Sequence, residues 1–82
     1  MLGYPSSIEE RENLEIDLLL EAIYRMTGYD FRGYMRSSIA RRIKNRLNKD
    51  HLTTVSELLV RVIHEEGYVN NLLSDFSINV TD

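Results

Sequence analysis

Residues 13–28 read NLEIDLLLEAIYRMTG, and their apolar side chains have the spacing of an α-helix. Two apolar sets recur at helical intervals: Leu14, Leu18, Ala22 and Met26 form one line, and Ile16, Leu19, Leu20 and Ile23 widen it. An apolar arc wider than one helix face indicates contact with more than one neighbour. We therefore expect this helix to lie at the centre of the fold.

The ends of this first helix are marked by capping residues. Ser7 followed by Glu10 has the form of a capping box, in which a hydroxyl and a carboxylate satisfy the first free amides of a helix. Gly28 follows Thr27 and supplies the left-handed conformation in which helices commonly end. The first helix is thus predicted to begin at Ser6 or Ser7 and to end at Gly28.

Three further helices are expected after it. One runs to about Lys49, the next begins after Thr54 with Glu57 as its capping partner, and a short fourth carries apolar residues at helical spacing up to Phe76. In the turn after Gly28, the aromatic residues Tyr29, Phe31 and Tyr34 are expected to plug the end of the core. The sequence therefore predicts the all-α class, as a small bundle of about four helices over residues 1–76.

Composition excludes several classes of protein. The chain has no cysteine, so disulfides and thiolate metal sites are excluded, and a cytoplasmic location is expected. It has neither an apolar run long enough to span a membrane nor a secretory signal. His51 and His64 lie thirteen residues apart without the close partners of a metal motif, and both are expected at the surface. We predict no catalytic residue and no metal site.

Positive charge is concentrated in residues 32–49, which hold seven of the ten lysines and arginines and no acid, whereas all thirteen acids lie elsewhere. One face of the second helix contains no apolar and no acidic residue, and consists of Ser38, Arg41, Arg42, Asn45, Arg46 and Lys49. Two interpretations are open. The face is either a solvated surface that pairs with acids of the first helix, or a binding surface for an acidic partner, since arginine suits forked recognition of carboxylate and phosphate.

At this point the motifs resemble those of a known family. The run YDFRGY at residues 29–34, SIARRI at 38–43, Arg46-Leu47, and INVT at 78–81 resemble the N-terminal domain of the CheR family of chemotaxis receptor glutamate O-methyltransferases. The likeness covers residues 14–82 in order. It implies a parent enzyme that transfers a methyl group from S-adenosylmethionine to glutamates of chemoreceptors.

The resemblance also assigns roles to residues. It implies that Arg42 and Arg46 recognise the acidic methylation helices of the receptor, with Arg41 and Lys49 as neighbours. It implies that Asn79 and Thr81 contribute to the S-adenosylmethionine site, and that residues 77–82 begin a linker into a Rossmann-type methyltransferase domain that is absent from this chain. This fragment alone is then expected to be inactive and to hold no cofactor.

Two other functions remain as alternatives. The first is a small helical nucleic-acid-binding domain, in which the basic helix contacts the backbone or groove. The second is a regulatory docking module unrelated to methyl transfer. Base-reading side chains are scarce on the basic face and the rest of the surface is acidic, so nucleic acid is the less favoured partner.

Overall fold

The computed structural model describes residues 7–76, and all regular structure in this range is helical. The helices are α1 (Ile8–Thr27), α2 (Arg36–Lys49), α3 (Val55–His64) and α4 (Tyr68–Phe76). Their order and approximate bounds agree with the sequence analysis. The prediction of a small all-α bundle is confirmed for this part of the chain.

The predicted helix ends are also confirmed. The Ser7 hydroxyl accepts a hydrogen bond from the Glu10 amide at 3.1 Å, and Gly28 ends α1 with a φ of 87°. At α3, the Thr54 hydroxyl accepts from the Glu57 amide at 3.3 Å, while the Glu57 carboxylate accepts from the Thr53 amide at 2.7 Å. Both N-termini are therefore capped by groups that satisfy otherwise unpaired amides.

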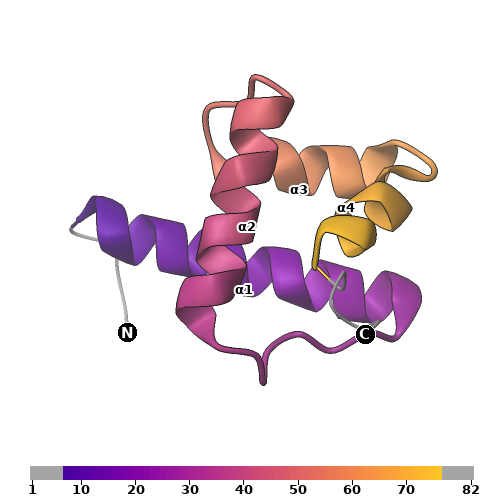
Figure 1. The fold of residues 1–82 in the computed structure, drawn as a ribbon, viewed down its shortest axis with the longest axis horizontal. Coiled ribbons are helices and arrows are strands. Elements are labelled where there is room, and N and C mark those ends of the chain that lie inside the picture. Colours follow the sequence, from indigo (N-terminus) through magenta and orange to yellow (C-terminus); the bar gives the residue numbers. More distant parts are fainter. Residues whose placement is uncertain (1–6, 77–82) are drawn as a thin grey trace.

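The four helices form two crossed pairs. Helix α3 lies along α1 and runs in the same direction (Figure 1), and the Ser56 hydroxyl donates to the Glu15 carboxylate across this seam at 2.5 Å. Helix α2 crosses over them, and α4 folds back against α2 and α3. This arrangement brings the end of α4 beside the middle of α2.

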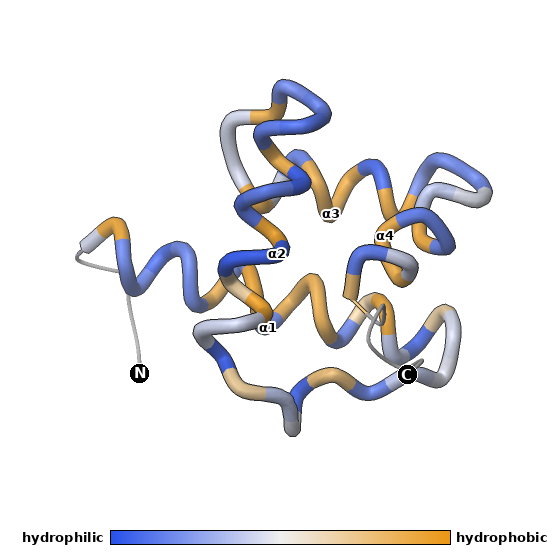
Figure 2. The backbone as a smooth tube through the Cα atoms, in the orientation of Figure 1, coloured by the Kyte–Doolittle hydropathy of each residue, from blue (hydrophilic) through white to orange (hydrophobic). Residues whose placement is uncertain are grey.

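The core lies where the helices meet. Figure 2 shows that α2 is mainly hydrophilic and α3 mainly hydrophobic. The side chains with less than 2% exposure come from all four helices: Leu19, Ile23, Ile39, Ile43, Val55, Leu58, Val62, Leu72 and Phe76. Full burial of such a side chain contributes about 1.5–3 kcal/mol, so this cluster is the main source of stability.

The central position predicted for α1 is wrong. Leu14, Leu18 and Met26 are 48%, 48% and 49% exposed, and only the second apolar set, which includes Ile16 and Leu19, is buried. The physical reason is geometric, since three shorter helices cover only one side of a 20-residue helix. An apolar line along α1 therefore remains at the surface of residues 7–76.

The aromatic turn before α2 is only partly as predicted. Phe31 is buried at 3% exposure and its ring meets the ring of Phe76 edge-on, with 5.2 Å between centroids. Tyr29 and Tyr34 are instead 61% and 53% exposed. The expectation that all three rings plug the core is wrong for the two tyrosines, because the Phe31 ring alone fills the space next to Phe76.

Candidate functional site

The basic face predicted on α2 borders an open groove of about 360 Å³. The groove is lined by five residues of that face and one residue of α4, namely Arg41, Arg42, Asn45, Arg46, Lys49 and Asp75. Four lining residues are cationic and one is acidic, so the groove carries a net positive charge. The helical spacing had correctly predicted that the five α2 residues share one face.

Packing on the opposite side of α2 explains why this face points outward. Ile39, Ile43 and Leu47 repeat every four residues and are all buried. Since they fix the rotation of α2, the positions between them are turned toward solvent and α4. Arg46 and Lys49 also lie in the last turn, where positive charge interacts favourably with the helix dipole.

Arg46 is the residue that departs most from expectation. Its side chain is only 9% exposed, its Nε donates to Asp50 Oδ2 at 3.1 Å, and its Nη1 donates to Asp75 Oδ2 at 3.0 Å. Its guanidinium also lies over the ring of Tyr68, at 5.3 Å from the centroid. Arg46 is therefore not free at the surface, because two acids of the same domain hold it.

Tyr68 completes this cluster by donating its hydroxyl hydrogen bond to Asp50. That hydrogen bond is the main reason why the pKa of Asp50 is lowered, with the charge of Arg46 as a smaller cause. Burial raises the pKa of Tyr68, and the bond to Asp50 raises it further. For Arg46, burial alone would lower the pKa, but Tyr68 and the two aspartates outweigh it and the pKa is raised. The cluster therefore favours the charged forms of Asp50 and Arg46 and the neutral form of Tyr68.

Arg42 contacts the same end of α4. Its Nε donates to the backbone carbonyl of Asp75 at 3.3 Å, and its side chain is half-buried. A cation at a helix C-terminus satisfies a carbonyl that has no partner within the helix. Arg42 and Arg46 thus both hold Asp75, through its backbone and its carboxylate respectively.

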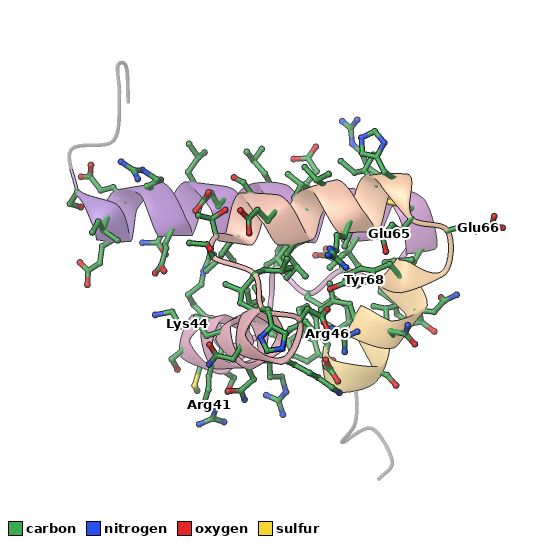
Figure 3. All side chains as sticks on the ribbon, turned by 90° about the horizontal axis from the view of Figure 1, so that it is seen from above. Arg41, Lys44, Arg46, Glu65, Glu66 and Tyr68 are labelled. Carbon is green, nitrogen blue, oxygen red and sulfur yellow. The ribbon has the colours of Figure 1, made fainter. Side chains whose placement is uncertain are left out.

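Arg41 and Lys49 are the cations of the groove that remain available. Both are exposed, and neither has an acidic partner within residues 7–76. Figure 3 shows the Arg41 side chain pointing away from the bundle, whereas Arg46 lies toward Tyr68. Two predicted contact residues therefore face solvent, and the other two are wholly or partly engaged by the domain.

Other cations of the basic stretch pair with the domain's own acids. Arg36 forms an ion pair with Asp17, and Lys44 lies 3.6 Å from Glu12, so α1 neutralises the near side of α2. Arg32 pairs with Asp30, two residues before it, and its guanidinium lies over the ring of Tyr24 at 4.8 Å from the centroid. Pairing with acids of the first helix is thus found for Arg36 and Lys44, which lie outside the predicted basic face. On that face, Arg46 pairs instead with Asp50 and Asp75.

Sequence reasoning missed the acids and the tyrosine of the cluster. The spacing of Arg46 and Asp50 by four residues was visible in the sequence, although Asp50 lies just beyond the helix. Asp75 and Tyr68 gave no comparable signal, because they are far from Arg46 along the chain and reach it only through the tertiary fold.

The described residues show no metal site. His51 and His64 are exposed, and within residues 7–76 no three His, Asp or Glu are grouped to hold an ion. S-adenosylmethionine carries a positive sulfonium, which the four cations of the groove would repel, so the groove does not fit it. The predicted cofactor residues Asn79 and Thr81, and the predicted linker 77–82, lie outside the described residues. In the same range no helix has the length and apolar content needed to cross a bilayer.

Comparisons with known proteins agree with this architecture. Residues 14–77 match the family described as "CheR methyltransferase, all-alpha domain". Over 74 residues the chain is 43% identical to "Putative methyltransferase Cher3" of Pseudomonas putida. The aligned segment covers 90% of this chain and 27% of that protein. The chain thus spans about a quarter of the length of this relative, and no solved structure gives a significant match. By its sequence match and its helical fold, the chain belongs to the CheR methyltransferase family and carries its all-alpha domain.

Proposed function

We propose that this domain is the substrate-recognition part of a chemotaxis protein methyltransferase that acts in the cytoplasm. The parent enzyme would methylate glutamate side chains of chemoreceptors, with S-adenosylmethionine supplying the methyl group. Membership of the CheR methyltransferase family supports a methyltransferase parent. The all-helical domain would bind the receptor, and a separate catalytic domain would carry out the methyl transfer. This domain would then have two partners, the receptor helices and the catalytic domain.

The observation that carries this proposal is the pair of available cations on the groove. Arg41 and Lys49 lie eight residues apart on one face, which is about 12 Å along the axis of α2. Arg42 lies between them and uses only its Nε in the contact with Asp75. A partner helix with several glutamates on one side matches such a row of separated positive charges, with arginine able to bind each carboxylate by two hydrogen bonds.

The energies make this interaction weak and dependent on salt. One exposed ion pair contributes about 0.2–1 kcal/mol, so specificity requires several pairs at once. Because these charges face solvent, physiological ionic strength screens them within about 8 Å. We therefore expect binding that is measurable at low salt and is lost as salt is raised.

A titration with a glutamate-rich helical peptide from a chemoreceptor methylation region tests the proposal. Binding should weaken about 3- to 10-fold in the double variant Arg41→Ala/Lys49→Ala, from the loss of two exposed pairs. The matched control is Arg11→Ala/Arg25→Ala, which removes the same charge from exposed positions of α1. Equal weakening by both double variants would show that net charge alone explains the effect. Unchanged binding in Arg41→Ala/Lys49→Ala would contradict the role of the groove.

The same variants separate the proposal from nucleic-acid binding. Random duplex DNA at low salt is the competing probe, because phosphates would meet the same cations. Peptide binding without DNA binding supports recognition of acidic protein. DNA binding that Arg41→Ala/Lys49→Ala abolishes, together with no peptide binding, would replace the proposal by the nucleic-acid alternative.

A further inference from the structure

Within residues 7–76, Asp75 is the one acid that lines the basic groove. Its Oδ2 accepts a hydrogen bond from Arg46 Nη1 at 3.0 Å, while its side chain remains 34% exposed to the groove. The carboxylate of Asp75 thus occupies the place on Arg46 where a carboxylate of a ligand would bind. The domain supplies its own competitor for this arginine.

We propose that Asp75 is an internal competitor that lowers the affinity of the groove for acidic ligands. By occupying Arg46 and adding a negative charge, it leaves Arg41, Lys49 and the terminal nitrogens of Arg42 as the cationic groups that a ligand can reach. Its carboxylate repels every acidic ligand, and it repels a helix with several carboxylates more strongly than a ligand with one. Neutralising Asp75 would therefore strengthen the binding of a polyacidic helix most.

The geometry allows Asp75 to be neutralised without dismantling the site. Arg46 keeps its hydrogen bond to Asp50 at 3.1 Å, and Arg42 contacts the Asp75 backbone carbonyl, which a substitution leaves in place. Asp75→Asn retains the shape of the side chain and removes only its charge. Asp75→Ala removes the carboxylate entirely and serves as a second variant with the same expected direction.

The inference rests on the proposed function, and one experiment distinguishes the two. Two helical peptides are titrated against each protein, one with four glutamates on one face and one with a single glutamate. The wild-type protein should prefer the first. Asp75→Asn should bind the peptide with four glutamates about 3- to 10-fold more tightly, and the gain should be smaller for the peptide with a single glutamate.

The control variant is Glu66→Gln, which makes the same charge change at an exposed position outside the groove and should leave both affinities within about 2-fold of wild type. A purely structural role for Asp75 predicts the opposite sign, since loss of the ion pair would lower the melting temperature and weaken binding. If the wild-type protein binds the peptide with four glutamates and Asp75→Asn binds it no more tightly, the competitor role of Asp75 is wrong and the proposed function stands. If neither protein binds either peptide, both are wrong.

Discussion

Arg46 Nη1 lies 3.0 Å from Asp75 Oδ2, so one ion pair joins the basic helix α2 to the last turn of α4. The same guanidinium holds Asp50 at 3.1 Å and lies over Tyr68. Arg46, which we propose lies in a recognition surface, is thus held by contacts within the domain. Substitution of Arg46 should therefore affect stability as well as binding.

Arg46→Ala should lower the free energy of unfolding by about 2–3 kcal/mol, because it leaves two partly buried aspartates without their partner. Arg46→Lys should recover only part of this loss, since a lysine ammonium cannot replace a fork that contacts two carboxylates. Urea denaturation measures both. Arg41→Ala, at an exposed position of the same helix, should stay within about 0.5 kcal/mol of wild type. Equal losses for Arg46→Ala and Arg41→Ala would contradict the assignment.

The Asp50 carboxylate should contribute to the acid sensitivity of the domain. Its pKa is lower in the folded state, through the Tyr68 hydrogen bond and the charge of Arg46. The unfolded chain therefore binds the proton more readily, so this contribution is present above about pH 4 and is lost as the pH falls through the folded pKa.

Asp50→Asn should accordingly be less stable than wild type by about 1–2 kcal/mol at pH 7, and the two proteins should converge as the pH falls toward 3. Urea unfolding at a series of pH values provides the test, with Glu66→Gln as a control whose curve runs parallel to that of wild type. A constant gap between Asp50→Asn and wild type at every pH would show that the hydrogen bond does not depend on the charge of Asp50.

His51→Gly should stabilise the domain by about 1 kcal/mol. His51 has a φ of 58° after the end of α2, a conformation that costs a residue with a side chain about 1–2 kcal/mol. The Leu52 amide donates to the Leu47 carbonyl at 2.8 Å across it, and the His51 amide donates to Asn48 at 3.3 Å, which is the pattern that usually ends in glycine. The melting temperature should rise in His51→Gly. It should fall in His64→Gly, because His64 lies within α3 and glycine is unfavourable there.

Phe31→Ala should be the most damaging change in the turn between α1 and α2, at about 3–4 kcal/mol, because it removes a buried ring that packs on Phe76. Tyr29→Ala should cost less than about 1 kcal/mol, since that ring is mostly exposed. Denaturant unfolding of the two variants compares rings that are two residues apart. Similar losses in both would contradict the partial plug seen in the structure.

The local part of this fold was predictable because its signals lie within a few residues of each other. The caps at Ser7 and Thr54, the stop at Gly28 and the buried repeat of Ile39, Ile43 and Leu47 all depend on short spacings. Such spacings fix the rotation of a helix and hence which residues share a face. For the same reason the basic face of α2 was predicted correctly as a set.

The parts that could not be predicted depend on how helices pack. Leu14 and Leu18 have the spacing of core residues, but no neighbouring helix covers their side of α1 within residues 7–76. Arg46 has the spacing of a surface residue, but α4 brings Asp75 across it. A single sequence shows which residues share a face of a helix, but it does not show which other helix packs against that face. The burial of residues at the edge of a face could therefore not be predicted.

The three-way contact of Arg46 with Asp50 and Asp75 also has an evolutionary consequence. A lineage that lost only the arginine would retain two adjacent carboxylates that repel each other, and a lineage that lost only the aspartates would retain a cation in a poorly hydrated place. Either intermediate would fold less well than its ancestor. Positions 46, 50 and 75 should therefore change together among related proteins, whereas positions 41 and 49 should vary with the binding partner.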